Sequence, residues 1–196
     1  MGRHRTIDRE AVLDAAEKVV SRDGAARLTL EAVAAEAGIS KASVLYDYKT
    51  KRALIRAVIE RRVAVETAYI QTFVDALAGE PDALIRGRIA SAARHRSDLE
   101  RAVAFNLCAA LAQDAELREP IQAINRDQIA EIASQSTHPR GAMLAFLAAQ
   151  GLMMMEWFEL HSWSADERER IVADLGWLVD QSPTVPESSP SLPHQA

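Results

Sequence analysis

Residues 28–51 read Leu-Thr-Leu-Glu-Ala-Val-Ala-Ala-Glu-Ala-Gly-Ile-Ser-Lys-Ala-Ser-Val-Leu-Tyr-Asp-Tyr-Lys-Thr-Lys, and this stretch predicts two short helices joined by a tight turn. Ala34 is a small residue where two helices would cross closely, and Gly38 can adopt the positive φ that such a turn needs. Val44 would anchor the second helix from below. The offsets of four and six residues between these positions are typical of a helix-turn-helix, which places its second helix in the major groove of DNA.

Helical periodicity continues along the rest of the chain, and no run shows the strict alternation with β-branched residues that strands require. We therefore predict an all-α fold. Asp8, Thr29 and Ser40 are natural N-caps for the three helices of an N-terminal head, and Thr50 opens a long fourth helix. The predicted helices cover residues 8–22, 30–37, 40–46, 50–79, 82–95, 98–112, 116–134, 139–161 and 165–180.

Changes in composition divide the chain into three parts. Residues 1–48 form the predicted helix-turn-helix domain, and the long fourth helix joins it to a helical body over residues 49–180. From residue 181 the sequence is dominated by serine and proline, which cannot propagate a helix. We therefore expect residues 181–196 to be a disordered tail.

Composition and charge limit the kinds of protein that this chain can be. Hydrophobic residues make up 48% of it, yet no apolar stretch reaches the roughly 18 residues that a membrane span needs. We expect a cytoplasmic protein without a membrane partner. Residues 1–62 hold 13 Lys and Arg against 9 Asp and Glu, whereas residues 63–196 hold 10 against 19. The basic end suits a polyanion, although a solvated basic face would give the same count.

Residues that could carry chemistry do not form a catalytic or metal-binding pattern. The five histidines lack metal-ligand spacing, and no nucleophile elbow, phosphate loop or dinucleotide fingerprint occurs. We therefore predict neither an enzyme nor a metal or cofactor site. The single cysteine, Cys108, excludes an intrachain disulfide, and its apolar neighbours favour a buried thiol over a redox sensor.

The turn and second helix of the motif resemble the tetracycline-repressor (TetR) family of bacterial transcriptional regulators, over about the first 55 residues. The motifs that carry the resemblance are Gly38-Ile39-Ser40, Ala42-Ser43, Val44-Leu45-Tyr46-Asp47-Tyr48 and Lys49-Thr50-Lys51. Two positions depart from the family pattern, since Leu45 stands in place of a tyrosine and Asp47 in place of a histidine or tyrosine. This copy therefore has fewer obvious DNA contacts than the family pattern supplies.

Side chains in these motifs are suited to DNA. Ala42 and Ser43 are small enough for the helix to approach the groove floor, where Ala42 can touch a thymine methyl and Ser43 can bond a base edge. Lys41 can reach a guanine. Further candidates for phosphate oxygens and the minor groove are Thr29, Ser40, Tyr46, Tyr48, Lys49, Lys51, Arg3 and Arg5.

Plainer roles stay open for several of these residues. Tyr46 and Tyr48 would also serve as core aromatics of the head, and Tyr48 is the more suitable of the two. Lys49 and Lys51 would also form a solvated, charged turn. Phosphates would repel Asp47 unless it turns away to a helix terminus or pairs with Lys49 or Arg52. We therefore assign it no DNA contact.

The resemblance implies that the C-terminal helices form a ligand-binding and dimerisation body. Residues 142–163 are apolar around most of their helix, more than one packing face needs. Ala148, Ala149 and Gly151 would allow a close helix crossing, and the next helix carries an apolar stripe that includes Trp177. We expect a two-fold dimer with a four-helix seam, which would set two recognition helices roughly 34–36 Å apart.

The predicted ligand pocket combines soft apolar side chains with a few polar groups, as small-molecule cavities do. Its candidate residues are Phe105, Asn106, Cys108, Met143, Phe146, Met153, Trp157 and His161. Methionine and aromatic stripes at helical spacing also form ordinary cores. His161 would equally serve as a satisfied histidine at a helix end.

Two hypotheses of different classes follow from these patterns. The first is a homodimeric, ligand-responsive transcriptional repressor that a small-molecule inducer releases from a palindromic operator in double-stranded DNA. The second is a protein-interaction module of the same fold that has lost specific DNA reading, which the residues at positions 45 and 47 make conceivable. Steep salt dependence of DNA affinity would separate the two.

Overall fold

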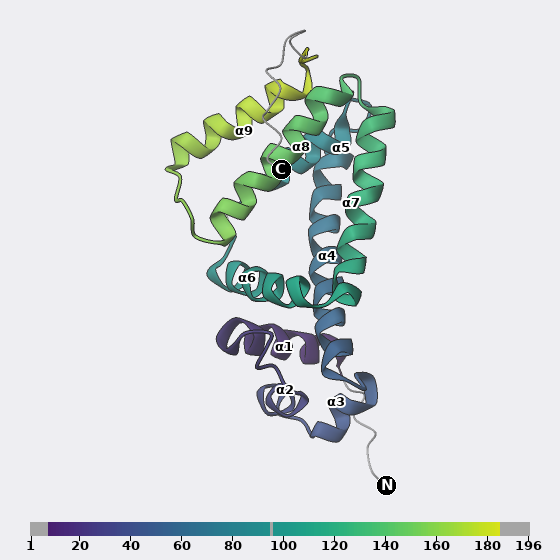
Figure 1. Ribbon diagram of the computed structural model, residues 1–196, viewed down its shortest axis with the longest axis vertical. Coiled ribbons are helices and arrows are strands. Elements are labelled where there is room, and N and C mark those ends of the chain that lie inside the picture. The colour runs from purple at the N-terminus through teal and green to yellow at the C-terminus, as the bar shows by residue number, and fades with distance from the viewer. Residues whose placement is uncertain (1–7, 95, 185–196) are drawn as a thin grey trace, which may run out of the picture.

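The computed structural model describes residues 8–94 and 96–184. Over these residues the chain forms nine α-helices and no β-strand, which confirms the all-α fold (Figure 1). The helices are α1 (Arg9–Asp23), α2 (Leu30–Ala37), α3 (Lys41–Asp47), α4 (Lys51–Ala76), α5 (Ala83–Ala92), α6 (Asp98–Gln113), α7 (Ala115–Gln135), α8 (Pro139–Trp157) and α9 (Ala165–Val179). Arg3, Arg5 and residues 185–196 of the predicted tail lie outside the described residues.

Local capping explains where the helices of the head begin and where α2 ends in the turn before α3. The side chains of Asp8, Thr29 and Ser40 each accept a hydrogen bond from a backbone N–H in the first turn of α1, α2 and α3. These bonds satisfy donors that have no partner within the helix. Gly38 ends α2 with φ 66° and ψ 32°, the left-handed conformation that glycine adopts without strain. The predicted caps and the predicted turn glycine are therefore confirmed.

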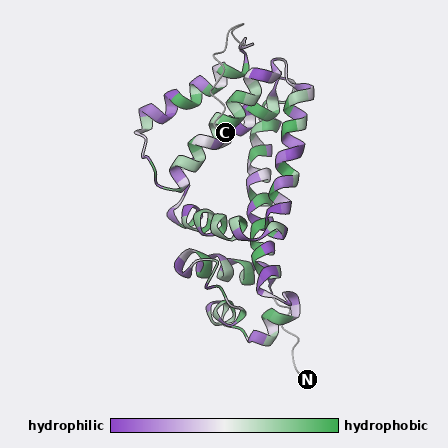
Figure 2. Cartoon of the chain, viewed as in Figure 1, coloured by the Kyte–Doolittle hydropathy of each residue, from purple (hydrophilic) through white to green (hydrophobic). Residues whose placement is uncertain are grey.

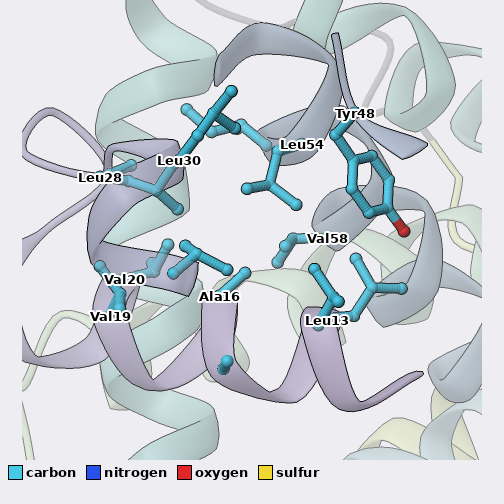
Figure 3. Close-up of a cluster of buried hydrophobic side chains, with 14 of the residues drawn as sticks. Leu13, Ala16, Val19, Val20, Leu28, Leu30, Tyr48, Leu54 and Val58 are labelled. Carbon is cyan, nitrogen blue, oxygen red and sulfur yellow. The ribbon is translucent and has the colours of Figure 1, made fainter. Parts of the chain in front are cut away.

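The core of the head joins α1, α2 and α3 to the first half of α4. Figure 3 shows Leu13 and Val20 of α1 in one cluster with Leu54 and Val58 of α4. The same cluster takes in three buried side chains from α6 and α7, namely Val103, Leu107 and Leu117. The head therefore packs directly on the body, and the domain boundary after residue 48 stays a prediction.

Helix α4 connects the two halves of the molecule. It runs for 26 residues from the head along the body (Figure 1). Beside its far end, Gly87 allows α5 to approach closely, because a Cβ at this position would lie 2.7 Å from Cγ2 of Val74. A second core of buried side chains from α5, α7, α8 and α9 completes the body. Helix α4 therefore contributes to the core of the head and packs against α5, which belongs to the second core.

Helix α8 is shorter than predicted. It ends at Trp157, whereas the prediction extended it to residue 161. Glu159 adopts a positive φ of 52°, and the N–H of Leu160 donates to the carbonyl oxygen of Met155 at 2.9 Å. This left-handed residue closes the helix. Hydropathy did not reveal the stop, because apolar residues continue as far as Trp163.

Hydrophobic residues are concentrated along α8 (Figure 2). Some of these residues face outward, and Leu147 is 55% exposed. On the neighbouring helix α9, Trp177 is 63% exposed. Ala148 and Gly151 are also exposed, whereas Ala149 is buried within the protomer. In the part of the chain that the structure describes, no helix is both long and apolar enough to cross a membrane. In a single chain, the apolar side chains on the outer face of α8 and α9 therefore remain exposed to water.

Candidate nucleic-acid interface and ligand cavity

Helix α3 is anchored by one buried residue and exposes most of the others. Val44 is completely buried in the core of the head. Lys41 and Ala42 are exposed, and Tyr46 is 74% exposed. The helix lies at the end of the head that is farthest from the body (Figure 1). Its outer face is therefore free to approach a macromolecule.

Two contacts hold polar groups on this surface. Oγ of Ser40 accepts a hydrogen bond from the N–H of Ser43 at 3.1 Å and lies 2.8 Å from the Ser43 hydroxyl. The ammonium group of Lys41 pairs with the carboxylate of Glu31 in α2. Both partners of this ion pair are more than half exposed, so water screens their attraction and the pair adds little stability. Lys41 can therefore exchange Glu31 for another acceptor at small cost.

Tyr48 and Asp47 are occupied inside the head. Tyr48 is 7% exposed and belongs to the core, where burial raises the pKa of its hydroxyl (Figure 3). Asp47 forms an ion pair with Arg9 of α1 at 3.5 Å, and its side chain is 14% exposed. The partner of Asp47 is thus Arg9 rather than Lys49 or Arg52. This pairing neutralises an acidic group at the end of α3.

The remaining predicted phosphate contacts lie near the starts of α2 and α4. Thr29 is the exposed N-cap of α2. Nζ of Lys49 lies 5.4 Å from the centre of the Tyr46 ring, and both residues are exposed. Lys51 instead donates to the carbonyl oxygen of Ala26, which ties the start of α4 to the loop before α2. Lys49 and Tyr46 therefore form the more accessible pair.

A cavity of about 370 Å³ lies between α4, α5, α6, α7 and α8. Four of the predicted pocket residues line it: Cys108, Phe146, Met153 and Trp157. Burial raises the pKa of the Cys108 thiol. Because the thiolate is the reactive form, this shift disfavours the redox-sensor alternative.

The other four predicted pocket residues lie outside the cavity wall. Phe105 is 48% exposed and packs edge-to-face on another aromatic ring. Asn106 donates to a backbone carbonyl one turn earlier in α6, and Met143 packs against the core of the body. His161 lies beyond the end of α8, against the ring of Trp163.

The charged part of the cavity wall was not predicted from the sequence. The missed residues are Arg62, Glu66, Arg88, Arg96 and Glu100. Ion pairs join four of them: Arg96 lies 2.8 Å from Glu66, and Arg62 lies 3.4 Å from Glu100. One available signal was the group of five arginines within residues 86–101, in a part of the chain that is otherwise acidic.

Glu100 is the wall residue with the most strongly lowered pKa. Partial burial alone would raise the pKa, but hydrogen bonds from Ser97 and Arg94 outweigh this effect and lower it from 4.5 to about 2. The Ser97 N–H and hydroxyl donate at 2.9 and 3.0 Å. The charged carboxylate therefore stabilises the folded chain above pH 4.5, and this contribution is lost as the pH falls from 4.5 to about 2.

Glu100→Gln retains the shape of the side chain and removes its charge. At pH 7 we expect the free energy of unfolding to fall by about 2 kcal/mol, with allowance for partial exposure. The difference from the wild type should shrink below pH 4.5 and vanish near pH 2. Urea unfolding at several pH values measures this difference in the free energy of unfolding. Glu80→Gln, at an exposed position, is the control. A difference that does not change with pH would contradict this role of the charge.

Two family models match the chain. Residues 12–58 match the model described as "Bacterial regulatory proteins, tetR family", and residues 82–180 match "Tetracyclin repressor-like, C-terminal domain". The first match spans the helix-turn-helix, and the second spans α5 to α9. No curated protein sequence matches the chain.

Solved structures share the fold over most of the chain. A candidate transcriptional regulator from Streptomyces coelicolor has a TM-score of 0.70 at 17% identity, over 88% of this chain and 98% of its own. The multidrug binding protein EbrR complexed with ethidium has a TM-score of 0.64 at 20% identity, over 88% and 99%. Its complex with malachite green has a TM-score of 0.66 at 23% identity, over 90% and 98%. At these identities the likeness establishes the arrangement of the helices alone.

Proposed function

Since the chain belongs to the tetR family of bacterial regulatory proteins, we propose that it is a homodimeric transcriptional repressor that a small molecule releases from DNA. The observation that carries this proposal is the outer face of α3, where Lys41 and Tyr46 are exposed while Val44 holds the helix to the head. The operator is a palindrome in double-stranded DNA, since a two-fold dimer presents two copies of α3. A regulator of genomic DNA acts in the bacterial cytoplasm.

In this proposal α3 reads the major groove. Lys41 and Ser43 approach base edges, while Tyr46 and Lys49 hold phosphate oxygens and set the register. Helix N-termini at Thr29 and Ser40 add backbone N–H groups and a positive dipole end toward phosphate. The ion pair between Asp47 and Arg9 supports this orientation, because it neutralises the carboxylate at the end of α3 that would otherwise repel phosphates. The departure at position 47 is therefore compatible with DNA binding.

The proposed dimer uses the outward apolar face of α8 and α9. Its most exposed apolar residues, with exposed fractions between 40% and 63%, are Leu144, Leu147, Met154 and Trp177. Ala148 and Gly151 are exposed on the same helix, so a partner helix can approach closely. A second copy would bury these side chains in a four-helix seam, and the removal of their apolar surface from water would favour association.

Induction would act through α4. Ile59 of α4 and Leu107 of α6 belong to the core of the head and also line the cavity. A ligand that displaces them therefore changes the packing that supports α1 and α3. If the ligand binds better to an arrangement in which the spacing of the two heads does not fit the operator, ligand binding lowers the affinity for the operator. By linkage, the operator lowers the affinity for the ligand by the same coupling free energy.

The DNA-reading role is tested by Lys41→Ala and Tyr46→Ala. We expect each to weaken operator binding about tenfold or more, because each removes a contact to DNA and leaves the head core intact. An operator selected from a random DNA pool, followed by fluorescence anisotropy titration, measures the affinity. Lys18→Ala is the control, since it removes the same charge from an exposed position on α1.

Salt separates this proposal from the protein-interaction module. A DNA reader that releases counterions should lose affinity steeply as salt rises, with a shallower slope for Lys41→Ala than for the wild type. Wild-type affinity for both variants, or no selected sequence at all, would refute the assignment of α3 and favour the interaction module.

A further inference from the structure

Three buried hydrogen-bond donors in the wall of the cavity have no partner among the described residues. They are Nε of Arg88, Nη1 of Arg96 and Nε1 of Trp157. A buried donor without an acceptor costs roughly 1–3 kcal/mol, so such groups are rare in folded proteins. All three are N–H groups. The cavity therefore lacks acceptors rather than donors.

The charges of the wall are also unbalanced. Glu66 is matched by Arg96 at 2.8 Å, and Glu100 by Arg94 at 3.0 Å and Arg62 at 3.4 Å. Arg88 has no carboxylate within ion-pair distance in the described part of the chain. Its guanidinium lies 5.3 Å from the centre of the Phe146 ring. One positive charge of the wall is thus left without a counter-charge.

Arg88 keeps its charge despite burial. Burial lowers the pKa of Arg88, and the charge of Glu66 opposes this shift. A guanidinium nevertheless stays protonated in proteins, so it cannot relieve the imbalance by losing a proton. Arg96 is 7% exposed, and its guanidinium lies 5.8 Å from the centre of the Trp157 ring. Arg96 therefore lies beside Trp157 and pairs with Glu66, the same carboxylate whose charge acts on Arg88.

The rest of the wall is largely apolar. Its aliphatic residues include Ile59, Ile70, Leu107, Leu111, Ile121 and Ile124. A volume of about 370 Å³ falls within the range of cavities that hold small organic ligands. The wall of the cavity thus combines aliphatic side chains with the arginines Arg62, Arg88 and Arg96.

We propose that this cavity binds a small amphipathic carboxylate, with its carboxylate paired to Arg88 and its apolar body among the aliphatic residues of the wall. Nη1 of Arg96 and Nε1 of Trp157 donate to the remaining lone pairs of the carboxylate. Arginine suits this group, because its fork of N–H donors matches a carboxylate in geometry and in charge. The inference rests on the proposed function in taking this cavity to be the inducer site, and it adds the chemical class of the inducer.

Three probes with a straight chain of ten carbons and different head groups test the class of ligand: decanoate, decanol and decyltrimethylammonium. Isothermal titration calorimetry on the purified full chain, without DNA, measures each affinity. We expect decanoate to bind at least about tenfold more tightly than decanol, since it alone supplies the missing acceptors and counter-charge. The cationic probe should bind most weakly. Equal binding of the three probes, or no binding of decanoate, would overturn the proposal.

Arg88→Met identifies the residue responsible. It should weaken decanoate binding about tenfold and leave decanol binding unchanged, because the methionine stays apolar and fills a similar space. Arg140→Met, at an exposed position of α8, is the control for the loss of one positive charge. Arg88→Lys should retain part of the preference and provides a second variant if Arg88→Met unfolds. Unchanged decanoate affinity in a folded Arg88→Met would refute the assignment.

Release of DNA is measured separately, by adding decanoate to the complex of protein and selected operator. Binding of decanoate without release of DNA would support the ligand class and contradict its role as an inducer. Failure of the protein to bind any operator would refute the proposed function and leave the calorimetric result intact.

Discussion

Gly141→Ala is expected to lower the free energy of unfolding by about 3 kcal/mol, the upper end of the usual cost of overpacking. Gly141 lies in the first turn of α8, where a Cβ would collide with the carbonyl oxygens of Leu178 and Gln181 at the end of α9. Both obstacles are backbone atoms, so no side-chain rotation can relieve the clash. The start of α8 and the end of α9 would have to separate, which disturbs the core of the body.

Gly176→Ala is the matched control. No heavy atom lies within 4 Å of the Cβ that an alanine would add there, and the residue is inside α9. Alanine in a helix is favoured over glycine by roughly 0.5–1 kcal/mol, so this variant should be equally or more stable than the wild type. Urea unfolding should be compared at one protein concentration, because the proposed dimer would be stabilised by mass action. Equal stability of the two variants would show that α8 and α9 can adjust at no cost.

Much of the head followed from chemistry that is local in the sequence. Asp8, Thr29 and Ser40 cap their helices, and Gly38 makes the turn, because each acts on backbone groups within a few residues of itself. The partner of Asp47 was not foreseen, since Arg9 comes from another helix of the head. Local patterns thus predicted where helices begin, but not which charged groups meet between helices.

The wall of the cavity was even harder to predict from local sequence patterns than the ion pairs of the head. The mixture of soft apolar and polar side chains selected Phe146 and Trp157, which line the cavity, but it could not separate them from Phe105, which is exposed on α6. The pair between Arg96 and Glu66 joins residues that are 30 positions apart. Charged residues on a helix are usually solvated. The sequence alone therefore did not indicate that these charged side chains face a cavity between α4, α5 and α6. The clash at Gly141 was hidden for the same reason.

Arg61→Met is expected to lower the free energy of unfolding by about 3 kcal/mol, because it leaves a buried carboxylate without its main partner. Arg61 of α4 reaches three acidic residues of α1. Its guanidinium lies 2.7 Å from Asp14, 2.8 Å from Glu17 and 3.4 Å from Glu10. The side chain of Glu17 is only 9% exposed, and its other cation, Arg62, is 3.8 Å away. The network therefore holds α1 to the helix that connects head and body.

Arg56→Met is the matched control, since it makes the same change five residues earlier in α4. Arg56 also pairs with two carboxylates, those of Glu60 at 2.8 Å and Glu119 at 2.9 Å, but its side chain is 41% exposed. Exposed pairs are worth about 0–1 kcal/mol, so this variant should unfold almost like the wild type. Equal losses for the two variants would mean that burial of Glu17 does not matter.

The double variant Glu17→Met with Arg61→Met distinguishes a buried unpaired charge from a lost attraction. If the cost of Arg61→Met comes from the stranded carboxylate, removal of that carboxylate should restore most of the lost stability, because apolar residues can replace a buried ion pair. Operator binding, which the loss of this contact between α1 and α4 should also weaken, is not expected to recover in parallel. The double variant would still lack the directional contact between α1 and α4, so we expect it to fold stably, to bind operator more weakly than the wild type and to respond less to ligand in anisotropy titrations. Full recovery of both properties would show that apolar packing alone sets the position of the head on α4.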